Sequence, residues 1–193
     1  LIYYRGFSWL YGFVGSFSYV VMVNSSWTLN HINQIWKIPS KTKIVYPPCD
    51  TKKLLEFPIL NGRQPTILSV SQFRPEKNHK LQIQIIAELL KNHPEFKCGP
   101  KSITLVLLGS VRNAEDKSRV DELEKLIETL ELQVLFNCIF VLLRQPYIQI
   151  VQNASYERLL HYLRISKVGL HTMIDEHFGI SLIEYMVFFK KCI

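Results

Sequence analysis

Residues 175–184 of the chain read DEHFGISLIE, and they follow a short apolar run, VGLHT, at residues 168–172. The apolar run is too short for a helix and predicts the end of a buried strand. Apolar residues recur after Gly179 at helical spacing and predict the start of a helix, which includes Ile180, Leu182, Ile183 and Met186. The stretch is therefore a strand-to-helix turn, the connection from which α/β folds are built.

Two carboxylates bracket this turn. Glu176 falls in the loop, and Glu184 lies about one and a half turns into the helix at ~3.6 residues per turn. The N–H groups at the helix start, near Phe178, Gly179 and Ile180, suit an anion, and a glycine allows close backbone approach. Carboxylates accept hydrogen bonds from hydroxyls. The pattern indicates a ligand with sugar hydroxyls and a phosphate, a sugar nucleotide. On spacing alone, the simpler interpretation is two solvated charges.

The alternation of strand and helix begins at residue 66. Apolar runs predict strands at 66–70 and 103–108, and a helix is predicted at 157–165 before the last strand. Two more helices are predicted between these strands. The first is capped by Asn78, and its inward face is expected to hold Leu81, Ile85, Ile86, Leu89 and Leu90. The inward face of the second is expected to hold Val120, Leu123, Ile127 and Leu130. This order predicts an α/β class fold with a parallel sheet covered by helices on both faces.

The amino-terminal part is apolar and aromatic. We expect a helix over residues 1–14, a strand at 19–24, a second helix capped by Ser25 or Ser26, and a strand at 43–46. Residues 1–23 are also long enough to span a bilayer, but Arg5, serines and glycines interrupt them. A membrane-facing helix is therefore the lesser interpretation of this segment.

Residues 47–65 contain four prolines and a glycine, which predicts a linker between two domains. The predicted domains are residues 1–46 and residues 66–193.

Two cations lie in the loop after the first strand of the second domain. Ligands of parallel α/β sheets bind beyond the carboxyl ends of the strands. Arg74, Lys77, Gly109 and Glu176 all follow predicted strands, so we expect them to share one rim. A guanidinium fork and an ammonium beside a helix start suit a diphosphate. Taken as an isolated pair, Arg74 and Lys77 would be interpreted as solvated loop cations.

The composition is that of an ordinary globular protein, with 48% hydrophobic and 20% charged residues. The formal net charge of +7 favours phosphate-bearing or membrane-surface partners. No nucleic-acid-binding signature is present, and we predict no nucleic-acid partner. The four cysteines are far apart and form no paired motif, so the sequence indicates neither a zinc site nor a disulfide framework.

The loop SVSQFRPEKN at residues 69–78 and the pair Glu176 and Glu184 resemble the retaining GT-B glycosyltransferases that carry a glutamate–seven–glutamate motif. Further stretches are similar to the mannosyltransferases of asparagine-linked glycosylation within that family, namely VMVNSSWT at 21–28, IVYPPCD at 44–50 and GLHTM at 169–173. The resemblance covers roughly residues 1–134 and 153–186. It implies a GT-B fold, in which residues 1–46 end the first, acceptor-side Rossmann-like domain and residues 66–193 form most of the donor-binding domain.

The resemblance implies an alpha-1,2-mannosyltransferase that uses GDP-mannose, works with retention and needs no obligatory metal or other cofactor. The acceptor would be dolichol-diphosphate-linked Man3GlcNAc2, which receives its fourth and fifth mannoses. The implied location is the cytosolic face of the endoplasmic reticulum membrane, with other mannosyltransferases of the pathway as further candidate partners. No residue in the sequence fixes guanine over another base.

The resemblance also assigns roles. Arg74 and Lys77 would hold the donor diphosphate, with Gly109 on the same rim. Glu176 would be the catalytic group that binds mannose hydroxyls near the reacting carbon, and Glu184 would hold the ribose. The donor-binding set is completed by His177, Phe178, Gly179 and Ile180, whose backbone amides near the helix start would meet the sugar or phosphate. No metal-binding residue is implied.

Three stretches depart from the family pattern. Ser71 replaces a glycine beside the expected phosphates, where a side chain could crowd the donor. Residues 137–152 are expected to be an apolar insertion, and residues 187–193 do not continue the pattern. We hypothesise an incomplete or mis-spliced gene model whose product is inactive on its own. The alternative is a non-catalytic nucleotide-sugar-binding module, or a membrane-associated interaction module.

Overall fold

The computed structural model describes residues 2–58, 60, 62–132 and 146–189. The chain forms two compact units. Unit 1 comprises residues 1–49 together with 176–180, and unit 2 comprises residues 50–175 and 181–193. The boundary after residue 49 lies inside the proline-containing segment 47–65.

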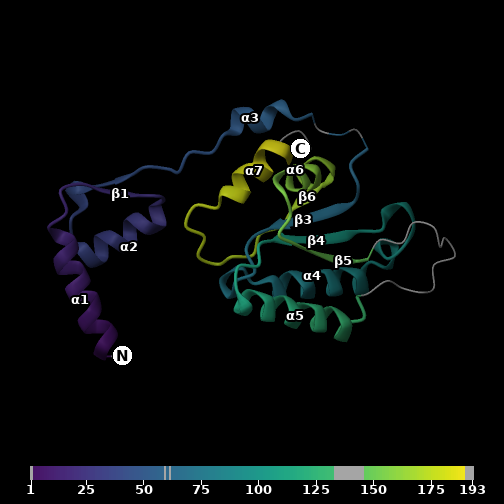
Figure 1. Cartoon of the computed structure of the whole chain (residues 1–193), viewed down its shortest axis with the longest axis horizontal. Coiled ribbons are helices and arrows are strands. Elements are labelled where there is room, and N and C mark those ends of the chain that lie inside the picture. The colour runs from purple at the N-terminus through teal and green to yellow at the C-terminus, as the bar shows by residue number, and fades with distance from the viewer. Residues whose placement is uncertain (1, 59, 61, 133–145, 190–193) are drawn as a thin grey trace. The chain divides into compact units, whose positions relative to one another are not determined.

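Unit 1 contains two helices and a two-stranded parallel sheet (Figure 1). Its elements are α1 (Ile2–Ser16), β1 (Val21–Val23), α2 (Ser26–Trp36), a short 3-10 helix (Pro39–Lys41) and β2 (Thr42–Ile44). Ser25 caps α2, since its hydroxyl accepts a hydrogen bond from the Thr28 amide at 3.1 Å. Helices α1 and α2 pack closely through Gly12 and Gly15, where a Cβ would overlap α2.

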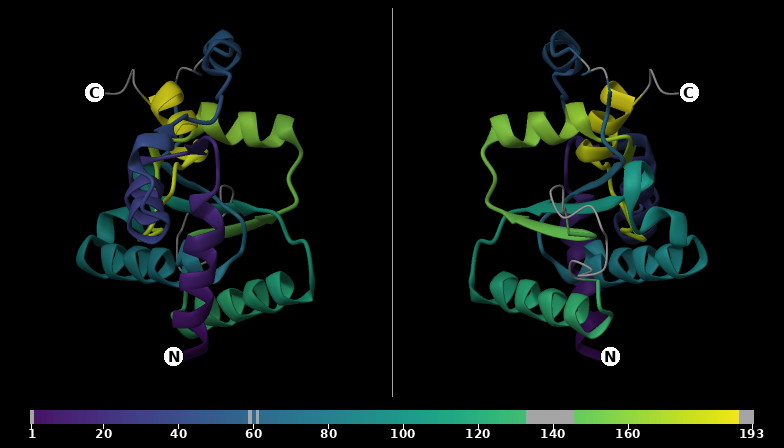
Figure 2. Two further views of the ribbon diagram at one scale, coloured as in Figure 1. Left: turned by 90° about the vertical axis from the view of Figure 1, so that its left-hand side faces the viewer. Right: turned by 90° about the vertical axis from the view of Figure 1, so that its right-hand side faces the viewer.

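Unit 2 contains a four-stranded parallel sheet in the order β5-β4-β3-β6, which confirms the predicted α/β class (Figure 1). Its elements are α3 (Thr51–Glu56), β3 (Thr66–Val70), a 3-10 turn (Pro75–Lys77), α4 (His79–Asn92), 3-10 turns at Pro94–Phe96 and Gly99–Lys101, β4 (Thr104–Gly109), α5 (Ala114–Thr129), β5 (Ile148–Gln152), α6 (Tyr156–Ile165), β6 (Val168–Gly169) and α7 (Ile180–Phe189). Helices α4 and α5 cover one face, and α6 lies on the opposite face (Figure 2).

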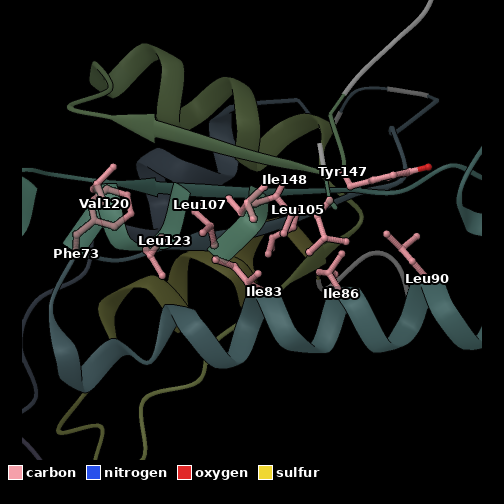
Figure 3. Packing of buried hydrophobic residues seen from close by; sticks show 12 residues of the cluster. Phe73, Ile83, Ile86, Leu90, Leu105, Leu107, Val120, Leu123, Tyr147 and Ile148 are labelled. Atoms are coloured by element: carbon pink, nitrogen blue, oxygen red, sulfur yellow. The ribbon is translucent and has the colours of Figure 1, made fainter. Parts of the chain in front are cut away.

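The core of unit 2 lies between the sheet and helices α4 and α5 (Figure 3). Every residue of β4 is buried because helices cover both faces of a central parallel strand. The core side chains on this face include Phe73, Ile83, Ile86, Leu105, Leu107 and Val120. The loop residue Phe73 is fully buried, so the core extends beneath the segment that carries Arg74 and Lys77.

The structure corrects the last part of the expected insertion at residues 137–152. Residues 148–152 form β5, an edge strand of the sheet in register with β4, and Ile148 and Val151 are buried. Residues 137–145 lie outside the described part of the chain. Residues 187–189 continue α7, and Phe188 is 1% exposed. The last four residues also lie outside the described part.

Several helix and strand details were predicted wrongly. Leu81 and Ile85 are 40% exposed, because α4 instead buries Gln82, Ile83, Ile86 and Leu90. Leu130 follows the end of α5 and is exposed. Asn78 precedes α4, but its left-handed backbone places no side-chain hydrogen bond on the helix. The last strand, β6, covers only residues 168–169 of the expected 168–172. The chain leaves the sheet after β6, and Thr172 contacts the β3–α4 loop.

Candidate functional site

Strand order indicates a candidate ligand site at the carboxyl ends of β3 and β6. The chain builds outward from β3 through β4 to β5, and then returns to add β6 on the other side of β3. Helix α4, which follows β3, and helix α6, which leads into β6, therefore lie on opposite faces of the sheet (Figure 2). In open parallel sheets this reversal leaves a crevice where ligands bind. The segment that follows β3 carries Arg74 and Lys77, as the sequence predicts.

The loop between β3 and α4 is anchored to the core by Phe73, and its cations lie at the surface. Phe73 is buried in the core, whereas Arg74 is 40% exposed and lies 3.6 Å from the Glu76 carboxylate. An exposed ion pair of this kind contributes little to stability and can exchange partners. Arg74 can therefore turn to an anionic ligand at small cost.

Gly109 ends β4 directly beside this loop. A Cβ at this position would lie 2.1 Å from the Ser71 carbonyl oxygen and 3.1 Å from the Phe73 ring. Backbone hydrogen bonds fix both sides of the contact, since the Ser71 amide bonds to Leu108 O at 3.0 Å and the Asn153 amide bonds to Gly109 O at 2.8 Å. The predicted site residue Gly109 thus lies next to the β3–α4 loop because only glycine permits this approach.

Ser71 does not project freely from the loop. Its hydroxyl lies 2.9 Å from Nε2 of His79, the first residue of α4, and the His79 ring also packs against Phe73 with centroids 5.1 Å apart. Burial, with the nearby Lys77 charge, lowers the pKa of His79 to about 4. His79 is therefore neutral near pH 7 and acts as a hydrogen-bond partner of Ser71. Whether Ser71 crowds a donor stays a prediction.

Lys77 is held by the segment that follows β6. Its ammonium donates to Met173 Sδ at 2.9 Å, and its carbonyl oxygen accepts a hydrogen bond from the Thr172 hydroxyl at 2.7 Å. The buried amide of Gln82 donates to the same hydroxyl at 2.8 Å. These contacts join residues about ninety positions apart in the sequence. They bring the β3–α4 loop and the β6–α7 segment together at the reversal of strand order.

Glu184 lies in the second turn of α7 and is half-buried, which raises the pKa of its carboxyl. The neighbouring Tyr185 anchors this helix to the sheet. Its hydroxyl oxygen accepts a hydrogen bond from the Val70 amide at 2.5 Å, and its ring fills the space that a side chain at Gly169 would need. The helix that carries Glu184 is therefore fixed against the ends of β3 and β6.

The segment 176–180 belongs to unit 1. The Glu176 carboxylate accepts the His177 amide at 3.1 Å and the Phe178 amide at 3.5 Å. The His177 ring stacks on Trp27 with centroids 4.4 Å apart, and Phe178 stacks on Tyr46 at 6.0 Å. Gly179 has a φ of 74°, a conformation that favours glycine. The Phe178 amide, expected to be free for an anion, thus already faces a carboxylate of its own chain.

The predicted site residues accordingly fall into two sets. Arg74, Lys77, Gly109 and Glu184 lie in unit 2, and the structure brings the first three together around the end of β3. The second set, Glu176, His177, Phe178, Gly179 and Ile180, lies in unit 1. That the two sets form one donor site stays a prediction.

Sequence reasoning missed four residues that shape this region: Gln82, Thr172, Tyr185 and Asn153. Asn153 has a left-handed backbone with a φ of 50°, and its side-chain oxygen accepts the Val111 amide at 2.8 Å. The signals for these residues are weak in the sequence. A buried glutamine on an otherwise apolar helix face is the clearest of them.

The described residues contain neither a candidate metal centre nor a candidate membrane-spanning helix. They contain no group of three or more His, Cys, Asp or Glu side chains placed to hold a metal ion. Within residues 2–132 and 146–189, apart from 59 and 61, no helix has the length and apolarity needed to cross a bilayer.

Comparison with known proteins gives matches over both units. The family model described as "Glycosyl transferases group 1" matches residues 50–193, and the model described as "ALG11 mannosyltransferase N-terminus" matches residues 1–36. The chain is similar to the GDP-Man:Man(3)GlcNAc(2)-PP-Dol alpha-1,2-mannosyltransferases of Homo sapiens (45% identity) and Dictyostelium discoideum (42% identity), over 96% of its length. It spans only 36% and 35% of those relatives, about a third of their length.

Solved structures show the same fold at low identity. The chain is similar to Anabaena Alr3699/HepE in complex with UDP and glucose, with a TM-score of 0.65, 18% identity and coverage of 89% of this chain and 42% of that one. It is also similar to a UDP-forming trehalose-phosphate synthase from Burkholderia xenovorans, with a TM-score of 0.62, 16% identity and coverage of 88% and 43%.

Proposed function

Because the chain belongs to the group 1 glycosyl transferases, we propose that it is part of an alpha-1,2-mannosyltransferase that uses GDP-mannose. The proposed acceptor is dolichol-diphosphate-linked Man3GlcNAc2, which receives its fourth and fifth mannoses. The observation that carries the proposal is the pair of cations, Arg74 and Lys77, on a braced loop where the strand order of unit 2 reverses. The similarity to named mannosyltransferases over 96% of the chain supports the choice of sugar and acceptor.

In this proposal the cations of unit 2 stabilise the leaving group. Transfer breaks the bond between the mannose anomeric carbon and a diphosphate oxygen, and the electron pair leaves with GDP. The acceptor hydroxyl oxygen forms the new bond to that carbon, and its proton passes to an oxygen of the departing diphosphate. Negative charge grows on the diphosphate as the bond breaks, so fixed positive charge from Arg74 and Lys77 lowers the barrier directly. The proposed reaction needs no obligatory metal.

Glu184 and Glu176 would bind hydroxyl groups. Glu184 is half-buried, and burial raises its pKa, so a hydrogen-bonding ribose would offset part of the cost of its charge. Glu176 now accepts two backbone amides. Mannose hydroxyls can replace these amides at the carboxylate, which would free the Phe178 amide for the sugar or phosphate.

Donor binding tests this proposal. We expect the 193-residue chain to bind GDP-mannose in calorimetry, and Lys77→Ala and Glu184→Ala each to weaken binding about tenfold to fiftyfold. A charge-assisted hydrogen bond contributes ~1.5–3 kcal/mol, which accounts for effects of that size. UDP-glucose should compete poorly. Lys91→Ala, which removes an exposed cation of α4 far along the helix, is the matched control.

A folded chain that binds neither GDP-mannose nor GDP would contradict the donor assignment. Equal binding of GDP and UDP would contradict the choice of guanine while leaving the sugar-nucleotide site in place.

We further propose that unit 1 lies against the cytosolic surface of the endoplasmic reticulum membrane. Residues 1–49 contain Arg5, Lys37, Lys41 and Lys43 and no acidic residue. Helix α1 exposes several large apolar or aromatic side chains, among them Tyr3, Tyr4, Phe7, Trp9, Leu10, Phe13 and Val14. Aromatic residues and cations favour the boundary between anionic headgroups and acyl chains.

Vesicle binding tests this location. The chain should bind vesicles that contain anionic lipid, and the double replacement of Trp9 and Phe13 by serine should reduce binding at least tenfold, because burying each aromatic side chain contributes ~1.5–3 kcal/mol. Replacing the exposed Ile85 of unit 2 by serine is the control. Undiminished binding by the double variant would contradict a role for α1.

A further inference from the structure

The hydroxyl of Thr172 joins two connections at the end of β3. Thr172 follows β6, and its Oγ1 lies 2.7 Å from Lys77 O and 3.3 Å from Asn78 O. Nε2 of Gln82, in the second turn of α4, lies 2.8 Å from the same oxygen. One side chain therefore links the loop that carries the cations, the helix after that loop and the segment after β6.

The directions of these hydrogen bonds follow from the chemistry of the groups. A carbonyl oxygen cannot donate, so the single hydroxyl proton of Thr172 is directed to Lys77 O, with a weaker share to Asn78 O. The Thr172 oxygen can then only accept, and Gln82 must present its NH₂ group. With the opposite amide orientation, two oxygens would face each other without a proton between them. The Thr172 hydroxyl thus donates its one proton to Lys77 O and accepts a hydrogen bond from Gln82.

Gln82 is a costly residue at this position. It is 1% exposed, and its Oε1 has no hydrogen-bond partner among the residues that the structure describes. A buried polar atom without a partner lowers the stability of the folded state. An apolar side chain of the same length would fill the space without that cost. The amide therefore serves the bond to Thr172 rather than the packing of α4.

The arrangement fixes the backbone of the residue with the proposed diphosphate contact. Lys77 is held at its carbonyl by Thr172, and the next residue, Asn78, has a left-handed backbone with a φ of 51°, a conformation that few residues other than glycine and asparagine adopt. The Lys77 ammonium donates a hydrogen bond to the thioether sulfur of Met173. A thioether is a weak acceptor, which a phosphate oxygen would displace.

We propose that Thr172 and Gln82 are positioning residues for Lys77, which hold its backbone so that its ammonium meets the donor diphosphate. The inference rests on the proposed function for the identity of the ligand. The hydrogen-bond network that carries it is independent of that identity. Neither residue touches the donor in this scheme, because both act through Lys77.

Thr172→Val keeps the shape of the side chain and removes the hydrogen bonds that its hydroxyl makes with Lys77 O, Asn78 O and the Gln82 amide. We expect GDP-mannose binding by the 193-residue chain to weaken about tenfold, which corresponds to ~1.4 kcal/mol, while Thr172→Ser restores it. In a Lys77→Ala background, Thr172→Val should have no further effect on binding. Gln82→Met should also weaken binding, yet leave the exchange protection of β4 amides unchanged or increased. A purely structural role would lower stability and binding together.

Amide hydrogen exchange of residues 74–80 supplies a readout that needs no ligand. Exchange should become faster in Thr172→Val and remain slow in Thr172→Ser. Thr129→Val is the matched control, because the Thr129 hydroxyl also bonds a backbone carbonyl but on the exposed face of α5. If the unaltered chain binds no donor, the proposed function fails, and the exchange data alone decide the positioning role. Unchanged exchange in Thr172→Val, or additive effects with Lys77→Ala, would overturn the inference.

Discussion

Gly109→Ala should lower the free energy of unfolding of unit 2 by at least ~3 kcal/mol. A single added methyl carbon would lie 2.1 Å from the Ser71 carbonyl oxygen, far inside van der Waals contact. The atom that the methyl group would meet belongs to the backbone, so it cannot rotate away as a side chain could. Both backbones are held by hydrogen bonds to β4 or to the residue after β5. Overpacking of a fixed core typically costs ~1–3 kcal/mol, and this contact belongs at or above the top of that range.

The measurement must report on unit 2. The chain has three tryptophans, and all of them, Trp9, Trp27 and Trp36, lie in unit 1, so tryptophan fluorescence would miss the effect. Exchange of β3 and β4 amides follows unit 2 directly. Gly99→Ala is the control: Gly99 has a φ of 79° and open space around it, so only backbone strain of ~1–2 kcal/mol is expected. Equal protection in Gly109→Ala and the unaltered chain would contradict the steric argument.

Sequence periodicity correctly predicts the elements of unit 2 whose pattern of buried and exposed residues is regular. β3 is predicted to the residue at 66–70, and α6 differs by one position, because buried strands and amphipathic helices carry strong patterns. β5 was missed. Its sequence, IQIVQ, alternates in the manner of a half-exposed edge strand, but it follows an apolar stretch that fits no part of the family pattern. Pairing with β4, a tertiary contact, decides its structure.

The inward face of α4 shows a second limit of prediction from sequence periodicity. Apolar residues at 81, 83, 85, 86, 89 and 90 cover more than half of the helix surface, so periodicity alone does not fix which stripe is buried. Gln82 lies within the buried stripe because it bonds Thr172, ninety residues away. If every polar residue is assumed to face solvent, Gln82 is placed outside, and the predicted buried face of α4 shifts to include Leu81 and Ile85. The positions of the candidate cations were predicted better, because strand ends locate them without any knowledge of side-chain contacts.

His79 gives unit 2 a sensitivity to acid. Its pKa is lowered from 6.5 to about 4, first by burial and then by the charge of Lys77. Between those two pH values the unfolded chain takes up a proton that the folded chain does not. Stability must therefore fall as the pH falls through this window, by up to ~1.4 kcal/mol per pH unit and about 3 kcal/mol in total. Above pH 6.5 the contribution is constant, because His79 is neutral in both states.

His79→Gln should remove this slope, since a glutamine stays neutral and can still hydrogen-bond the Ser71 hydroxyl. We expect the unfolding free energies of the two proteins, measured by exchange of β4 amides at pH 7.5, 6, 5 and 4, to diverge on the acid side, with the variant gaining on the unaltered chain. His161→Gln removes an exposed histidine of α6 and should leave the slope in place. Parallel curves for His79→Gln and the unaltered chain would show that His79 is protonated without cost. In that case a charged imidazolium beside Lys77 would join the cations available to the donor diphosphate, and donor affinity should rise as the pH falls. A neutral His79 predicts no such rise, so the pH dependence of GDP-mannose binding separates the two states independently of stability.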